Sequence, residues 1–271
     1  MDHTKPILFF DCSYAIFYRY YAIKGWYKRA LEKDIDVENV LKDAEFMTKY
    51  DTIFEKTVVD ICKKYSTPLT NVVFAKDCSR DKIWRTSLYP QYKASRDDRN
   101  NSFNGDIFKH TYNVLVPKLQ AKYGFHTLYQ NHLEADDLIA IFVSYMRGKG
   151  LGTVLTIITN DNDYVQLYKH NVNIYNLQHK SLRDRITDVD TYLQHKIIVG
   201  DKSDNIKSVG KKIGEKTAQK MIDDPATYNK IMSQPGVQEQ YDLNKTLIDF
   251  DNIPPELVKE VRNQIDNMIT I

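Results

Sequence analysis

The stretch Ile7-Leu8-Phe9-Phe10-Asp11 decides the fold, because it is a short apolar run that ends in an acid and the same pattern returns three times. The later runs are Val72–Lys76 before Asp77, Phe125–Tyr129 before Glu134, and Val154–Thr159 before Asp161. Short apolar runs separated by longer, helix-compatible stretches predict buried parallel strands in βα units. The sequence therefore predicts an α/β fold, in which helices flank a central, mostly parallel sheet.

Seven carboxylates follow these runs and form the candidate site. They are Asp11, Asp77, Glu134, Asp136, Asp137, Asp161 and Asp163. Open parallel sheets bind ligands at the carboxyl ends of their strands, so we expect these acids to meet at one edge. Carboxylates held close together repel one another unless they share protons or cations. Because no His or Cys is interleaved, the cluster favours Mg²⁺ or Mn²⁺ over zinc.

Each acidic motif also has a plainer interpretation. Glu134, Asp136 and Asp137 suit the first turn of a helix, where acids meet the positive end of the helix dipole, and Asp161-Asn162-Asp163 suits a simple turn. The metal hypothesis depends on the coincidence of four such strand ends.

Composition limits the class of protein. A chain of 271 residues with 42% hydrophobic content can bury one large core, or a core and a smaller second domain. Three cysteines, Cys12, Cys62 and Cys78, form no even disulfide set and fit a reducing compartment. The apolar runs are too short to span a bilayer, and the first residues lack the layout of a signal peptide. We therefore expect an intracellular protein that acts in the cytoplasm or nucleoid, away from membranes.

A net charge of only +2 hides two basic stretches. Six lysines stand against two acids in 202–220, and seven basic residues against four acids in 76–99. Lysine and arginine on either side of an acidic centre suit a phosphodiester substrate, since they hold backbone phosphates while metal ions mask the acids. Charge runs are also common as solvated surface, and this alternative stays open for either run alone.

The strand signal divides the chain into two predicted units. We expect an α/β domain over 1–180, with a polar segment of mixed loop and helix at about 80–108, and a mostly helical domain over 181–271. In the second unit, Gly210 and Gly214 precede a helix-compatible stretch. Such glycines suit a tight hairpin whose amides point at a phosphate, although an ordinary helix-turn-helix connection needs them equally.

Six motifs in order resemble the 5′ nuclease superfamily, the flap endonucleases and 5′-3′ exonucleases of phages and of bacterial DNA polymerase I. The motifs are Phe10-Asp11, Ala75-Lys76-Asp77, Tyr89-Pro90-Gln91-Tyr92-Lys93-Ala94-Ser95-Arg96, Glu134-Ala135-Asp136-Asp137, Thr159-Asn160-Asp161-Asn162-Asp163 and Gly200-Asp201-Lys202-Ser203-Asp204-Asn205. The resemblance covers most of residues 6–222.

The resemblance implies a site that binds two ions, Mg²⁺ or Mn²⁺, with Asp201 and Asp204 added to the seven acids. It implies a helical arch around the 5′ strand, where Lys93 and Arg96 neutralise charge on the phosphate, and a helix-hairpin-helix-like element that grips duplex DNA, often with a potassium ion. The residues that we assign to DNA contact on this basis are Phe17, Arg80, Arg85, Tyr92, Gly210, Lys211, Lys212, Gly214 and Lys216. Phe17 or Tyr14 could stack on a terminal base, but core packing is the favoured interpretation for both.

The hairpin departs from the family pattern. The usual G-V-x-G-I-G-x-K-T-A is replaced by a stretch with one extra residue that begins at Ser208 and lacks the first glycine. The hairpin shape and the potassium ion are therefore open. No sliding-clamp motif is evident at the C-terminus, where Gln264 begins nothing of that kind.

The resulting expectation is a monomeric, structure-specific 5′ nuclease that acts on branched or 5′-ended duplex DNA, and on RNA–DNA hybrids if it removes primers, in DNA replication and repair. As a nuclease without an attached polymerase, it resembles phage-encoded or accessory bacterial forms. Two alternatives stay open, a PIN-type metal-dependent ribonuclease and a non-catalytic DNA-binding protein. A haloacid-dehalogenase-like phosphatase is excluded, because Asp11 is followed by Cys12 and Ser13 where a second Asp is needed.

Overall fold

The computed structural model describes residues 1–95, 103–186 and 188–269, and its centre is one parallel sheet. The strands are β1 (Ile7–Asp11), β2 (Val72–Ala75), β3 (His126–Leu128), β4 (Leu155–Ile158) and β5 (Asn173–Tyr175). Their order is β3-β2-β1-β4-β5, and every neighbouring pair is parallel. The predicted α/β fold is confirmed. The edge strand β5 was not predicted.

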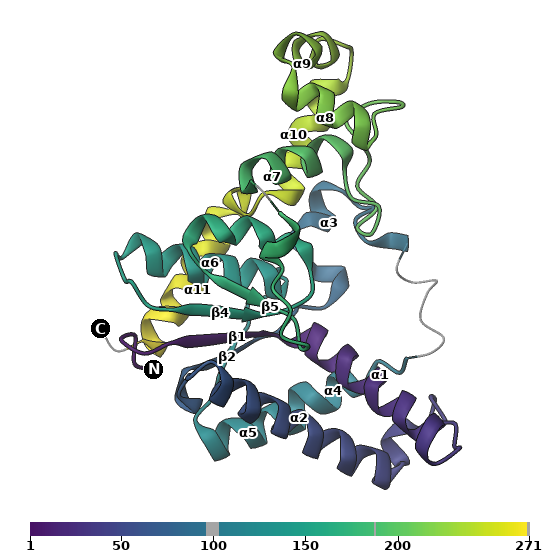
Figure 1. Ribbon diagram of the computed structural model, residues 1–271, viewed down its shortest axis with the longest axis vertical. Helices are drawn as coiled ribbons and strands as arrows, with labels where there is room; N and C mark the ends of the chain where they lie inside the picture. The colour runs from purple at the N-terminus through teal and green to yellow at the C-terminus, as the bar shows by residue number, and fades with distance from the viewer. Residues whose placement is uncertain (96–102, 187, 270–271) are drawn as a thin grey trace.

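Helices cover both faces of the sheet (Figure 1). The helices of the first part of the chain are α1 (Cys12–Ala30), α2 (Ala44–Lys64), α3 (Trp84–Leu88), α4 (Asp106–His110), α5 (Val116–Tyr123) and α6 (Ala135–Gly148). Because side chains alternate along a strand, Leu8 and Phe10 pack toward α1, α2 and α5, whereas Ile7 and Phe9 pack toward α6. All four side chains are fully buried. The core therefore lies on both sides of β1 and holds its carboxyl end in place.

Two short segments complete the surroundings of that end. A π-helical turn, η5 (Thr111–Leu115), joins α4 to α5, and a 3₁₀ segment, η6 (Asn162–His170), follows β4. The side chain of Asp161 begins η6 by accepting a hydrogen bond from the Asp163 amide at 2.9 Å. The acids after β4 are thus part of a capped turn.

A second helical unit follows the sheet, as the sequence predicts. It contains α7 (Val189–Val199), α8 (Glu215–Asp223), α9 (Pro225–Met232) and α10 (Val237–Ile248). Its small core gathers apolar side chains of α7, α8 and α10. Figure 1 shows that this unit projects to one side of the sheet, away from α1 and α2.

Gly200 ends α7 with a φ of +77° and begins the turn toward α8. A Cβ atom there would lie 2.4 Å from the carbonyl oxygen of Lys207, so no other residue fits. The next residues close a tight loop, in which Asp201 and Ile206 exchange backbone hydrogen bonds of 3.0 and 2.7 Å. This loop holds the last two predicted acids.

The last helix, α11 (Pro255–Met268), packs against α6 and β3. Its apolar stripe of Leu257, Val261 and Ile265 joins the core between α6 and the sheet, because residues four apart share one helix face. The single helical unit that we expected over 181–271 is therefore interrupted in space, with 255–268 returning to the first. Within the described ranges, no helix has the length and apolar character that a membrane span requires.

Candidate active site

Five of the predicted acids line one cleft of about 630 Å³ at the carboxyl edge of the sheet. They are Asp11, Asp77, Glu134, Asp136 and Asp161. We call this space the first cleft. Three strand ends and the first turn of α6 supply these side chains, as expected for a site at the carboxyl ends of parallel strands.

Asp11 and Asp77 are fixed by neutral donors. Asp11 accepts hydrogen bonds from the Tyr14 amide at 3.1 Å and the Thr159 hydroxyl at 2.9 Å. Asp77 accepts one from the Ala135 amide at 2.8 Å and a short one from the Ser13 hydroxyl. Burial, with the nearby charges of Asp77 and Asp161, raises the pKa of Asp11 to about 7. Burial, with the nearby charge of Glu134, also raises the pKa of Asp77, and the charge of Lys93 offsets this rise only in part.

Glu134 caps α6, and Asp136 follows in its first turn. Burial and the charges of Asp137 and Glu134 raise the pKa of Asp136 well above its usual range. Glu134 differs from its neighbours because Lys93 donates a short hydrogen bond to it. In the first cleft, Glu134 is thus paired with a lysine, whereas Asp11, Asp77 and Asp136 lie near other carboxylates.

Asp137 lies outside the first cleft, and its role as a metal ligand stays a prediction. One of its oxygens lies within 4.8 Å of oxygens of Glu134 and Asp136, as a shared ion would require. However, the Arg85 guanidinium donates to both of its oxygens, at 2.7 and 2.8 Å, and the side chain is wholly buried. These two bonds take up both carboxylate oxygens. Asp137 acts as the counter-ion of Arg85.

Arg85 and Tyr92 do not reach solvent, so their predicted contact with DNA is corrected. Arg85 donates to Asp137, to Glu134 at 3.2 Å and to the Leu247 carbonyl at 2.7 Å, and it is 2% exposed. The Tyr92 hydroxyl is buried between Glu134, at 2.9 Å, and Asp204, at 3.1 Å. Both residues therefore hold acidic side chains in place through hydrogen bonds and do not offer a surface to DNA.

The remaining acids border a second cleft of about 630 Å³, which shares Asn160 and Asp161 with the first. Asp163 and Asp201 line it, and one oxygen from each lies within 4.8 Å of one from Asp204. Burial alone would raise the pKa of Asp201, but Lys196 and hydrogen bonds from Ser203 hold it at about 2. The nine predicted acids therefore form two adjoining groups, with Asp137 set behind the first.

The structure describes Lys93 and Arg80 of the predicted arch segment. Lys93 lines the first cleft with its ammonium against Glu134 and 3.6 Å from Asp204. Arg80 is exposed at the rim of the same cleft. Arg96 lies outside the described residues. The aromatic wall of the cleft is formed by Phe17, whose ring centroid lies 4.5 Å from that of Phe103 and 5.1 Å from that of Phe108.

The hairpin residues lie between α7 and α8, except Lys216, which belongs to the first turn of α8. Lys211, Lys212 and Lys216 are exposed, and Lys212 has a φ of +63° in the turn. A Cβ atom on Gly210 would lie 2.9 Å from Cδ1 of Ile213, so a larger residue there would require the Ile213 side chain to shift. Gly214 has open space around it. The potassium ion stays a prediction.

Sequence analysis missed three side chains that hold these acids. Ser13 and Thr159 bond Asp77 and Asp11, and Lys196 contacts Asp163 and Asp201. Ser13 follows Asp11 by two residues and Thr159 precedes Asp161 by two, so proximity to an acidic motif is a usable signal. Nothing in the sequence separates Lys196 from other helical lysines.

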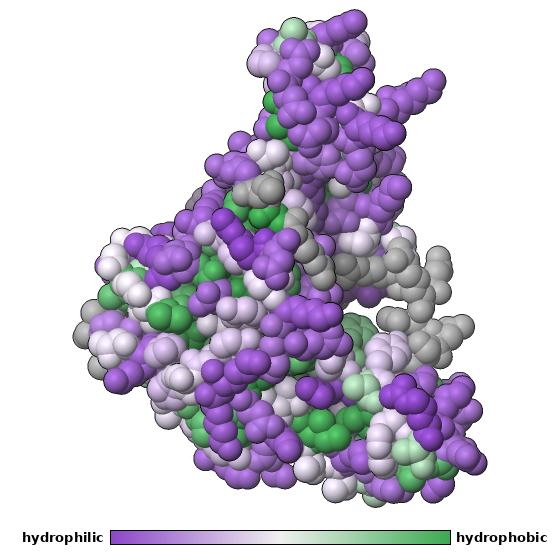
Figure 2. Space-filling view, viewed as in Figure 1, coloured by the Kyte–Doolittle hydropathy of each residue, from purple (hydrophilic) through white to green (hydrophobic). Residues whose placement is uncertain are grey.

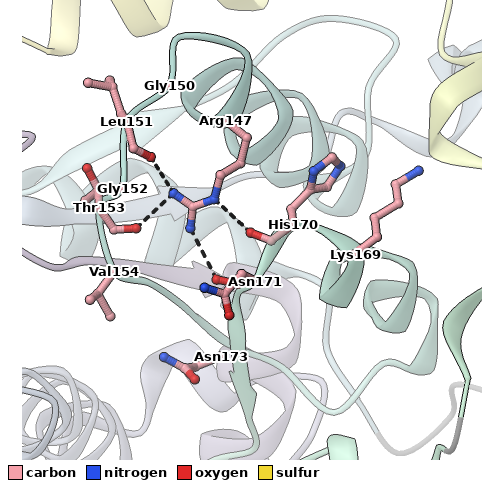
Figure 3. Close-up of a pocket in the computed structure, with 10 residues that line it drawn as sticks. All are labelled: Arg147, Gly150, Leu151, Gly152, Thr153, Val154, Lys169, His170, Asn171 and Asn173. Carbon is pink, nitrogen blue, oxygen red and sulfur yellow. Dashed lines mark hydrogen bonds between the residues drawn. The ribbon is translucent and has the colours of Figure 1, made fainter.

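A further cavity of about 510 Å³ opens at the opposite, amino end of β4 and β5. Figure 3 shows the Arg147 guanidinium at its centre, donating to the carbonyl oxygens of His170, Leu151, Thr153 and Asn171 at 2.7 to 3.2 Å. These bonds join the end of α6 to the loops before the two strands. The arrangement is structural, and it brings no acid cluster together.

Comparison with known proteins agrees with this geometry. A family model described as the 5′-3′ exonuclease, N-terminal resolvase-like domain, matches residues 6–197. The protein named ribonuclease H of Enterobacteria phage T4 is 26% identical over 215 residues, which are 72% of this chain and 69% of that protein. DNA polymerase I of Mycobacterium tuberculosis (strain ATCC 25618 / H37Rv) is 30% identical over 175 residues, which are 60% of this chain but only 18% of the polymerase.

Two solved structures share the fold. The 5′-exonuclease of phage T5 with zinc ions bound has a TM-score of 0.66 and 19% identity, and the match covers 97% of this chain and 99% of that one. A flap endonuclease of phage T5, in complex with DNA and metal ions, has a TM-score of 0.63 and 20% identity over 97% and 98% of the two chains. From the matched family model over residues 6–197, this chain belongs to the 5′-3′ exonuclease family, which confirms the resemblance to 5′ nucleases and the class of enzyme predicted from the motifs.

Proposed function

We propose that this protein hydrolyses phosphodiester bonds near the 5′ end of DNA with two divalent ions, Mg²⁺ or Mn²⁺. One observation supports this proposal most strongly. Five acids line one cleft, and a second acidic cleft adjoins it; the five are Asp11, Asp77, Glu134, Asp136 and Asp161. A non-catalytic DNA-binding protein would have no need for such a cluster.

The donor set fits the proposed ions. Every candidate ligand is a carboxylate, which suits hard cations that prefer oxygen. The pKa values of Asp11, Asp77 and Asp136 are raised for the same main reason, because each carboxylate is buried near other carboxylates. We assign one ion to Asp11, Asp77, Glu134 and Asp136 and the other to Asp161, Asp163, Asp201 and Asp204. Such ions, when bound, lower the pKa of an attacking water and stabilise a leaving oxygen.

The residues around the acids would orient the DNA. Lys93 and Arg80 border the first cleft, where positive charge would hold the scissile phosphate and offset the charge that develops on it. Phe17 offers a ring on which a terminal base could stack, in a way that does not depend on sequence. This arrangement favours recognition of a 5′ end over recognition of a base sequence.

The α7–α8 hairpin would hold the duplex at a distance from the chemistry. A groove of about 990 Å³ runs beside it and is lined by Lys202, Lys207 and Lys211, together with Gly210 and Gly214. Figure 2 shows that the unit of α7 to α10 presents a mostly hydrophilic face. Lysines on such a surface bind backbone phosphates without reading bases.

The substrate is part of the proposal. We infer branched or 5′-ended duplex DNA, with RNA–DNA hybrid as a second substrate, which the name of the phage T4 relative supports. That relative also supports a phage origin, with action inside the host cell. We propose a monomer, because both clefts are built from one chain.

The test is product analysis on 5′-labelled flap, nicked and RNA-primed duplexes with Mg²⁺. We expect cutting that stops in EDTA and falls by at least a hundredfold in Asp136→Asn. Asp60→Asn is the matched control, because Asp60 is an exposed acid on α2. Release of the whole flap as one oligonucleotide would identify endonuclease action, and release of mononucleotides alone would identify an exonuclease. Cutting that survives EDTA, or full activity in Asp136→Asn, would overturn the proposal.

A further inference from the structure

Lys196 lies inside the second cleft and not on the outer surface of its helix. It belongs to the last turn of α7, and its ammonium contacts Oδ1 of Asp163 and lies 2.9 Å from Oδ2 of Asp201. The side chain is only 13% exposed. The ammonium therefore connects an acid of η6 with an acid of the loop that follows α7.

The same carboxylates are those that a second divalent ion would use. One oxygen each of Asp163, Asp201 and Asp204 lies within 4.8 Å of the others, a spacing that a single cation could satisfy. An ammonium and a divalent ion would compete for this space, because both are held by the carboxylates of Asp163 and Asp201 and because they repel each other at short range. An ion that enters therefore competes with Lys196 for its two partners.

The first cleft is arranged differently. Asp11 and Asp77 are bonded there by Tyr14, Thr159, Ser13 and Ala135, which are neutral donors that leave the carboxylate charge in place. Among the contacts described, Lys93 holds one of the four acids assigned to the first ion, Glu134, whereas Lys196 holds two of the three acids clustered in the second cleft. The two clefts should therefore differ in their affinity for the same ion.

We propose that Lys196 is an internal counter-ion that holds the second acidic group together in the ion-free protein and weakens its binding of a divalent ion. This inference rests on the proposed two-ion function. It makes Lys196 a residue that sets ion affinity, through its contact with Asp163 and Asp201. The enzyme would then hold one ion firmly and take up the second only at higher concentration.

The experiment is a titration of the full chain with Mn²⁺, in which free Mn²⁺ is measured by electron paramagnetic resonance without DNA. The wild type should show one tight and one weak class of site. In Lys196→Met the weak class should tighten at least tenfold, while the tight class changes less than threefold. Lys202→Met is the matched control, since Lys202 is an exposed lysine that lines the same cleft, and it should change the weak class less than threefold.

Two further variants keep the outcome clear. Lys196→Gln should tighten the weak class as Lys196→Met does, and it serves if the methionine variant fails to fold by circular dichroism. Lys196→Arg keeps the charge and should leave the weak class weak. The inference is overturned if Lys196→Met and Lys196→Gln leave the weak class unchanged, or if Lys202→Met tightens it equally. A wild type that binds no Mn²⁺ would overturn the proposed function as well.

Discussion

Asp137 and Arg85 form a buried ion pair in which both carboxylate oxygens accept hydrogen bonds from the guanidinium, at 2.7 and 2.8 Å. We predict that Asp137→Asn lowers the free energy of unfolding by about 3–5 kcal/mol, because it leaves the Arg85 charge buried without its partner. Urea denaturation followed by circular dichroism measures this change. Asp161→Asn is the comparison, since Asp161 is exposed and should cost little. A stable Asp137→Asn variant that loses ion binding would show instead that Asp137 is a metal ligand.

The raised pKa of Asp11 predicts how stability depends on pH without metal. Since its pKa is about 7 in the folded protein and about 3.9 in the unfolded chain, the folded state binds more protons between these values. The free energy of unfolding should therefore fall as pH rises from 5 to 8 in EDTA. Each kcal/mol lost should lower the Tm by about 2 °C. Saturating Mg²⁺ should remove most of this fall, because the bound ion replaces the proton. Thermal unfolding at several pH values checks the sign, and a Tm that rises over this range in EDTA would contradict it.

The strand ends were predictable, whereas the partners of the charged side chains were not. Runs such as Ile7-Leu8-Phe9-Phe10 indicate a strand buried on both faces, and they place Asp11 at its end. The strand Asn173-Ile174-Tyr175 was missed because it is short, lies at the sheet edge and buries only Ile174 fully.

The charged residues required tertiary structure. Arg85 and Lys93 both belong to a basic stretch, yet Arg85 is enclosed by Asp137 and Leu247 while Lys93 lines the first cleft. Which of two nearby cations faces the core depends on packing against α6 and α10, which lie far along the chain. The role of Lys196 could not be predicted for the same reason, because its partners Asp163 and Asp201 come from two separate segments.

The hydroxyl groups behind the acids should affect ion binding. We predict that Ser13→Ala and Thr159→Val each weaken binding of the tighter Mn²⁺ by about tenfold, because they remove hydrogen bonds that orient Asp77 and Asp11. Isothermal titration calorimetry measures the affinity. Thr52→Val on α2 serves as the control, because its hydroxyl bonds only a helix carbonyl among the contacts described. Unchanged affinity in both variants would mean that packing alone positions these acids.

The aromatic wall should matter only for substrates with a single-stranded 5′ end. We predict that Phe17→Leu weakens binding of a 5′-flap duplex by about 1–3 kcal/mol, while a blunt duplex binds as before. Fluorescence anisotropy in Ca²⁺ measures both affinities. Trp26→Leu changes an exposed aromatic residue elsewhere on α1 and should leave both unchanged. Equal losses on the two DNAs would show that Phe17 acts through folding.

The hairpin lysines should contribute a salt-dependent grip on the duplex. We predict that Lys211→Gln combined with Lys212→Gln weakens binding of any duplex sequence alike and lowers the slope of log K against log salt by about 1 to 2. Lys230→Gln, an exposed lysine on α9, is the control. A loss confined to one DNA sequence would speak against a backbone contact.

The most direct test of the account is to locate the ions. Crystals soaked in Mn²⁺ should give one anomalous difference peak among Asp11, Asp77, Glu134 and Asp136, and at higher concentration a second beside Asp163 and Asp201. The absence of any peak in either cleft from a fully soaked crystal would contradict the central claim that these acids bind divalent ions.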